Sequence, residues 1–132
     1  MRLCLDTSAY SQFKRGECQV VEVLDSAGWI GVPTIVLGEL RTGFALGHKQ
    51  SENEKELAEF LRHPVVETLS VDDAATRVYA EIMVLLRRAG TPVPTNDIWI
   101  ASVAASVGAS VVTFDAHFAA IGRVGSIILE AS

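Results

Sequence analysis

The sequence has 132 residues, of which 49% are hydrophobic and 20% are charged, and its formal net charge is −5. This length predicts a single domain spanning residues 1–132, and the charge argues against a protein that coats nucleic acid through its overall field. An enzyme that handles one phosphodiester at a metal site is not excluded, because the cation then supplies the positive charge. No apolar run reaches the roughly 18 residues of a membrane span. Asp6 interrupts any apolar core of a signal peptide, so we expect a cytoplasmic protein.

The N-terminal half alternates short apolar runs with helical patterns. In chain order, the expected elements are a strand at 3–6, a helix at 18–28, a strand at 29–33, and helices at 34–47 and 51–61. Thr34 is the expected cap of the first long helix, and Ser51 with Glu54 has the spacing of a capping box.

The C-terminal half continues the alternation. The expected elements are a strand at 65–70, a helix at 70–90, a stiff connector at 91–95, a helix at 97–107, and strands at 110–114 and 125–130. Ser70 is the expected cap of the long helix, and Gly90 is its expected end. Continuously apolar strands alternating with helices predict a three-layer α/β/α sandwich around a mainly parallel sheet of about five strands.

Two acids stand where such a fold places its ligand sites, at the carboxyl ends of the strands, and a third joins them under one condition. Asp6 ends the first strand, and Asp115 follows the fourth. Asp97 opens the helix that leads into the fourth strand, so it reaches the same edge only if the connector at 91–95 crosses that edge.

Glu39 is a different case, because it lies inside a predicted helix. At 100° per residue it falls within about 40° of Ile35 and Leu46. We therefore expect its carboxylate to point toward the apolar side of the helix, where a lone charge is costly and needs compensation.

Each acid also has a purely structural interpretation. Asp97 suits a helix N-terminus, Asp6 a turn, and Asp115 the cap of a following turn. Glu39 has a long side chain that reaches water from the edge of a core. Together these interpretations weaken, because clustered acids repel one another unless a cation holds them.

The types of the candidate ligands indicate which kind of cation would suit them. All four candidate ligands are carboxylates, and Cys4 and Cys18 show neither a CxxC pair nor metal-binding spacing, so we expect two buried, reduced thiols. Oxygen ligands suit Mg²⁺ or Mn²⁺. Four carboxylates allow either two metals, or one metal and a general base, in the cleavage of a phosphodiester.

Four motifs in order, "LDTSAY", "VLGEL", "TNDIWIAS" and "VVTFDAHF", span essentially the whole chain and resemble the PIN-domain ribonucleases, in particular the VapC-like toxins. The segment "GVPT" departs from the family, which often has a Ser there. The resemblance implies a metal-dependent endoribonuclease with the catalytic acids Asp6, Glu39, Asp97 and Asp115.

The resemblance also assigns the metal ligands and the supporting residues. Asp6, Asp97 and Asp115 are the implied ligands. Thr113, Asn96 and Thr7 are implied to support the site, with Ser8 as an alternative to Thr7 in orienting Asp6. The implied partners are an RNA substrate, a cognate antitoxin that holds the toxin inactive, and a second copy in a homodimer. No individual basic residue is assigned to RNA, and His117 is more readily explained as a surface residue.

Three other classes of protein are weighed as alternatives. A phosphoacceptor receiver has paired acids after its first strand and a Lys after its fifth, whereas "LDTS" has one acid and "SIILEAS" has no Lys. A phosphatase with an Asp nucleophile needs D-x-D, but residue 8 is Ser. A non-catalytic signalling or interaction module with structural acids is disfavoured only by the repulsion expected among the acids.

Overall fold

The computed structural model describes residues 1–131, which form a five-stranded sheet and six α-helices. The strand order is β3-β2-β1-β4-β5, and every neighbouring pair is parallel. The strands are β1 Arg2–Leu5, β2 Trp29–Pro33, β3 Val66–Leu69, β4 Ser110–Thr113 and β5 Ser126–Ile128. The predicted α/β fold with a parallel sheet is therefore confirmed.

The centre of the sheet is apolar on both faces. Leu3 and Leu5 of β1 are fully buried, as are Val111 and Val112 of β4. The register sets Leu5 beside Val112. Strands buried on both faces have continuous apolar runs rather than alternating ones, and they need helices on either side.

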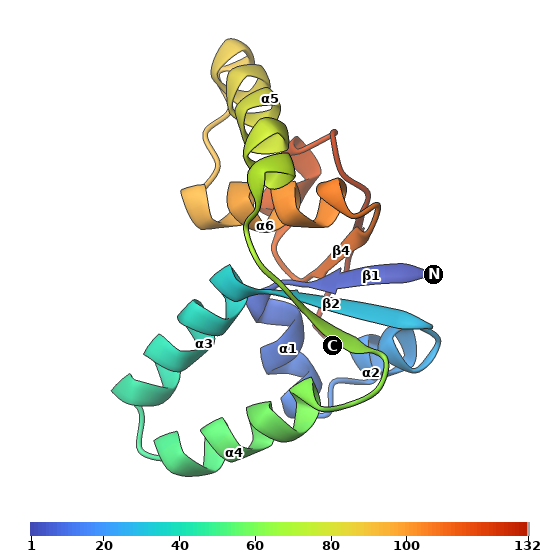
Figure 1. The fold of residues 1–132 in the computed structure, drawn as a ribbon, viewed down its shortest axis with the longest axis vertical. Helices are drawn as coiled ribbons and strands as arrows, with labels where there is room; N and C mark the ends of the chain where they lie inside the picture. The colour runs from blue at the N-terminus through green and yellow to red at the C-terminus, as the bar shows by residue number, and fades with distance from the viewer. Residues whose placement is uncertain (132) are drawn as a thin grey trace.

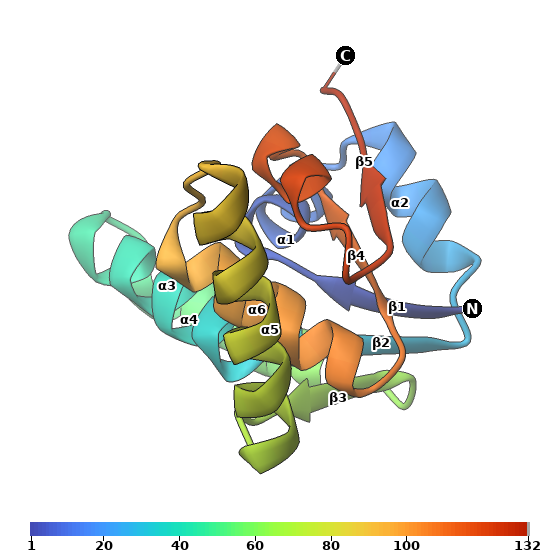
Figure 2. The same cartoon turned by 90° about the horizontal axis from the view of Figure 1, so that it is seen from above.

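Helices supply this cover in two layers. They are α1 Thr7–Lys14, α2 Cys18–Asp25, α3 Thr34–Leu46, α4 Gln50–Leu61, α5 Asp73–Ala89 and α6 Thr95–Ser106, with the 3₁₀ helix η1 Ala116–Ala120. In Figure 1, α5 and α6 lie on one side of β1 and β2, and α1 to α4 lie on the other. Seen from above in Figure 2, α5 and α6 lie over the sheet. No helix within residues 1–131 is both long and apolar enough to cross a membrane.

Three predicted helix starts were wrong in detail. Thr34 is the first residue of α3 and does not cap it, because Pro33 occupies the cap position. Ser51 lies inside α4, whose start has no side-chain cap. Asp72 replaces Ser70 as the cap of α5, where its side chain accepts a hydrogen bond from the Ala75 amide. The preceding strand and loop decide where the chain turns into each helix, and capping preference alone does not reveal this.

The two cysteines differ in burial. Cys4 is buried in β1, as expected, whereas Cys18 is exposed at the first residue of α2. The buried residues of α2 are Val20 and Leu24, so the expectation of two buried thiols was wrong for Cys18.

Candidate active site

Asp6 stands immediately after β1 and is only 4% exposed. Its carboxylate caps α1 by accepting a hydrogen bond from the Ala9 amide over 2.8 Å. Ser8 Oγ lies 2.8 and 3.0 Å from the two carboxylate oxygens, and the Thr113 hydroxyl donates to Oδ2. Burial raises the pKa of Asp6, the hydrogen bonds oppose this rise, and the nearby charge of Asp115 adds to it.

Thr113 connects Asp6 to the end of the neighbouring strand. It is the last residue of β4 and is fully buried, and its hydroxyl oxygen accepts the Asp115 amide hydrogen over 2.8 Å. The Ser8 hydroxyl likewise accepts the Phe114 amide hydrogen over 2.9 Å. These contacts join the carboxyl ends of β1 and β4, which pair directly at the centre of the sheet.

This junction is the switch point of the fold. From β1 the chain moves outward through β2 and β3, and it then returns to β4 on the other side of β1. Open α/β sheets bind ligands beyond the carboxyl ends of the strands at such a point. The structure thus places Asp6 and Asp115 at the edge that the sequence predicted.

Asp115 caps η1, with its Oδ1 accepting the His117 amide hydrogen over 2.9 Å. The imidazole Nδ1 of His117 also lies 2.9 Å from this oxygen. The His117 side chain is 58% exposed, in line with its expected surface position, but it faces the acids. Its spacing of two residues from Asp115 was the one sequence signal for this contact.

Asp97 reaches the same edge from α6, which lies on the opposite face of the sheet from α1 (Figure 1). It lies in the first turn of α6, and one ligand atom each of Asp97, Asp115 and His117 can be chosen so that all lie within 4.8 Å of one another. Partial burial raises the pKa of Asp97 to about 6, with further contributions from the charges of Asp115, Asp6 and Glu39, while His117 acts in the opposite direction. The connector therefore does bring the start of α6 to the edge where β1 and β4 end.

Glu39 lies on the flank of α3, and the prediction that it points to the apolar side was wrong. The buried face of α3 consists of Val36, Leu37 and Leu40, whereas Leu46 is 83% exposed. Leu46 belongs to the outer end of a hairpin that α3 and α4 form beyond the sheet (Figure 1), so it does not mark the core-facing side.

The expected compensation of the Glu39 charge is nevertheless present. The Thr7 hydroxyl donates to Oε1 over 2.6 Å, and the Asn96 side-chain amide donates to Oε2 over 3.4 Å. Both donors are neighbours of other acids in the sequence, Thr7 of Asp6 and Asn96 of Asp97. Thr7 and Asn96, which the resemblance implies as supporting residues, thus both orient Glu39.

The arrangement fits a hard divalent cation. The clustered groups are the carboxylates of Asp97 and Asp115 and the imidazole of His117. Burial is the main cause that raises the pKa values of Asp97 and Asp6, and the charges of neighbouring acids raise them further. A divalent cation bound between these groups would relieve the repulsion among the acids. One ligand atom each of Asp97, Asp115 and His117 lies close enough to share such an ion, and Asp6 adds a further carboxylate charge near Asp97.

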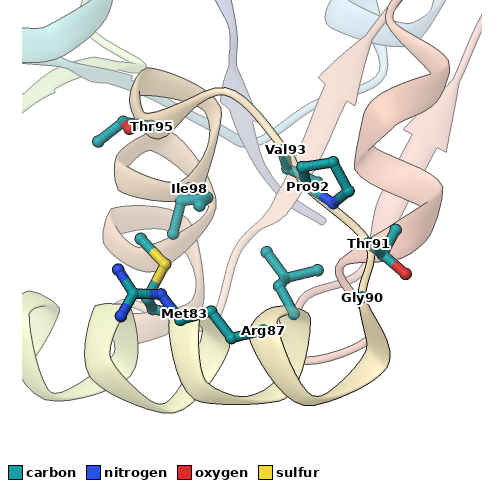
Figure 3. Close-up of a pocket in the computed structure, with 9 residues that line it drawn as sticks. Met83, Arg87, Gly90, Thr91, Pro92, Val93, Thr95 and Ile98 are labelled. Atoms are coloured by element: carbon teal, nitrogen blue, oxygen red, sulfur yellow. The ribbon is translucent and has the colours of Figure 1, made fainter.

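A separate hollow near α6 is lined mainly by apolar residues. About 420 Å³ in volume, it lies between the end of α5, the connector and α6, and its walls include Met83, Leu86 and Ile98 (Figure 3). Arg87 is its one ionisable lining residue, and none of the four acids contributes to it. The candidate active site is therefore the acidic cluster at the switch point.

The sequence model of the PIN domain matches residues 3–124. The chain belongs to the PIN-domain family. This PIN domain is similar to ribonuclease VapC5 of Mycobacterium tuberculosis, with 35% identity over 123 residues that cover 93% of this chain and 90% of the relative. The implied membership of the family is thereby confirmed.

Two solved structures resemble the PIN domain over nearly its whole length. One is a chain of the VapBC2 structure from Rickettsia felis bound to a promoter DNA fragment, with a TM-score of 0.85 and 25% identity over 97% of this chain and 98% of that chain. The other belongs to VapBC-5 from Mycobacterium tuberculosis, described as a member of the VapBC toxin–antitoxin systems, with a TM-score of 0.68, 29% identity and 98% coverage of both chains.

Proposed function

We propose that this PIN domain is a metal-dependent endoribonuclease and the toxin of a toxin–antitoxin pair, with residues 1–132 acting as one domain on cytoplasmic RNA. The proposal rests chiefly on the clustering of Asp97 and Asp115 with His117 at the switch point, where the charges of Asp6 and Glu39 also raise the pKa of Asp97. Its similarity to a named VapC ribonuclease supports RNA as the substrate, and it favours the nuclease over a receiver-like module.

In this proposal Asp6, Asp97 and Asp115 hold Mg²⁺ or Mn²⁺, and all four acids act in catalysis. The bound ion would lower the pKa of an attacking water and stabilise the charge that builds on the phosphoryl oxygens. Thr113 fixes the Asp6 carboxylate through its hydrogen bond. Glu39, oriented by Thr7 and Asn96, accepts the proton of the attacking water while the phosphorus–oxygen bond to the leaving nucleotide breaks.

A cleavage assay tests the reaction class. Purified protein dialysed against EDTA should leave single-stranded RNA intact, and adding Mg²⁺ or Mn²⁺ should restore internal cleavage because hard oxygen ligands bind these ions. Full cleavage in the chelator would contradict the role of the acids. Cleavage restored by Mn²⁺ but not by Mg²⁺ would identify the preferred ion.

The partners follow from the relatives. The similarity to a structure of a toxin–antitoxin system supports a protein antitoxin, and we propose a homodimer as the active form. Light scattering of the purified chain should give twice the monomer mass. Co-expression with the product of an adjacent short reading frame should yield a complex that no longer cleaves RNA, and failure of every neighbouring product to bind would count against the pairing.

A further inference from the structure

A groove beside the acidic cluster shares Glu39 and Asn96 with the candidate active site, and its other lining residues have no role in the proposed chemistry. We call it the α3 groove; it has a volume of about 390 Å³ and is widely open to solvent. Its lining residues, from the start of α3 to its middle and from α6, are Thr34, Ile35, Gly38, Glu39, Thr42 and Asn96. Because Glu39 and Asn96 also belong to the candidate active site, the groove opens directly from that site.

The walls of the groove suit a neutral, hydrogen-bonding ligand. They carry no Lys or Arg, and their one ionisable residue is the acid Glu39, so a phosphate is not favoured there. The Thr34 hydroxyl makes no hydrogen bond within residues 1–131, and the Asn96 side-chain oxygen accepts none there. Ile35 adds an apolar surface.

Gly38 on the wall of the groove is not explained by the fold. It lies inside α3, where glycine is less favourable than alanine. A Cβ built at this position meets nothing within 4 Å, so the packing does not require its absence. A glycine facing a ligand site allows the ligand to approach the helix backbone closely.

We propose that the α3 groove holds the sugar and base of a ribonucleotide next to the scissile phosphate, with Gly38 leaving the space for it. This inference rests on the proposed ribonuclease function. The phosphate itself lies over the acidic cluster, and the neutral part of the nucleotide contacts Thr34, Ile35 and Asn96. A 2′-hydroxyl, which both donates and accepts hydrogen bonds, matches these polar groups.

The test compares two glycines of the same helix. Gly38→Leu fills the groove, whereas Gly43→Leu places the same side chain on α3 outside the groove, also at an exposed position where a Cβ meets nothing within 4 Å. We expect Gly38→Leu to lower kcat/KM on random-sequence single-stranded RNA by about tenfold or more, chiefly through KM. Gly43→Leu should cleave like the parent.

Melting temperatures show whether a variant that loses activity is still folded. Both leucine variants should melt no lower than the parent, because leucine is a better helix former than glycine. If Gly38→Leu unfolds, Gly38→Ala replaces it and should show a smaller rise in KM with an unchanged or higher melting temperature.

Cleavage by Gly38→Leu at the parent's KM would overturn the groove assignment while leaving the ribonuclease function intact. A parent protein that cleaves no RNA would instead overturn the proposed function. A Gly38→Leu variant that changes oligomeric state would show that the groove faces a second copy of the chain and would also overturn the assignment.

Discussion

At the scale of single residues, the acids of the cluster have structural and candidate catalytic positions at the same time. Asp6 caps α1, Asp115 caps η1, and Asp97 lies in the first turn of α6. A helix N-terminus partly offsets the cost of a carboxylate near other carboxylates, because its free amides and dipole favour negative charge. The two interpretations that compete in the sequence therefore do not exclude each other in the structure.

Replacing Asp97 by Asn separates the two roles. In metal-free protein at neutral pH the variant should be more stable than the parent by at most about 1 kcal/mol, since Asp97 is partly exposed and water screens the repulsion. This gain corresponds to a melting temperature higher by roughly 3–5 °C for a domain of this size. RNA cleavage should be almost abolished.

Asp73→Asn is the matched control, because Asp73 lies in the first turn of α5 but pairs with Arg77 on the surface. It should cost a few tenths of a kcal/mol at most and leave cleavage unchanged. If Asp97→Asn behaves like this control in both assays, Asp97 serves only its helix.

The gain from Asp97→Asn should also depend on pH. The folded pKa of Asp97, about 6, lies above the ordinary value of 3.8 for an Asp side chain, so the protonated carboxyl favours the folded state. This stabilisation is fully present below the unfolded pKa and is lost as the pH rises through about 6. Denaturation curves should thus show the advantage of Asn above this pH and its decline toward about pH 4. A pH-independent difference would contradict the raised pKa.

Thr113 provides a second test at this scale. Thr113→Val keeps the shape but removes the buried hydroxyl that donates to Asp6 and accepts from the Asp115 amide. We expect a loss of about 1–3 kcal/mol in urea denaturation and a clear loss of cleavage. Thr113→Ser keeps the hydroxyl, so it should retain most of the activity. Equal activity of the two variants would show that the hydroxyl does not hold the site.

The sequence located the acids but not the contacts between them. Asp6 and Asp115 followed from the rule that ligand sites lie at the carboxyl ends of parallel strands. The contact of Glu39 with Thr7 could not be predicted from periodicity, because it depends on how α1 packs beside α3. The link from Thr113 to Asp6 likewise depends on the pairing of β1 with β4, which are more than 100 residues apart.

At the scale of elements, the site is assembled where three helical segments, α1, α6 and η1, begin. The start positions of helices were the least predictable part of the fold. Asp72 rather than Ser70 caps α5, and Thr34 does not cap α3. Strand and helix types were predictable because the apolar runs and their periods were clear. The exact first turn depends on how each loop leaves the sheet.

The cap of α1 yields a prediction about Asp6. Asp6→Asn keeps an oxygen that can accept the Ala9 amide hydrogen, whereas Asp6→Ala removes the cap and leaves the Thr113 hydroxyl without its acceptor. The Ala variant should be less stable than the Asn variant by about 0.5–2 kcal/mol in thermal or urea unfolding. Both should fail to cleave RNA. An active Asp6→Asn variant would show that the acid serves the helix alone.

At the scale of the whole molecule, the order of the strands brings distant acids together. The chain returns to the centre of the sheet between β3 and β4, so residues near positions 6, 97 and 115 meet at one edge. The net charge of −5 is compatible with this site, because a bound cation rather than a basic surface would meet the phosphate. Several basic side chains, including those of Lys14, Arg41 and Arg123, are engaged in surface ion pairs.

Anomalous diffraction from crystals soaked in Mn²⁺ shows whether these acids form a metal site. We predict a peak between the carboxylates of Asp6, Asp97 and Asp115, with manganese–oxygen distances near the ~2.0–2.2 Å typical of small divalent ions. The peak should be lost in Asp97→Asn crystals and retained in Asp73→Asn crystals. Wild-type crystals that bind Mn²⁺ only at other carboxylates, or that show no peak at this edge of the sheet, would contradict the account.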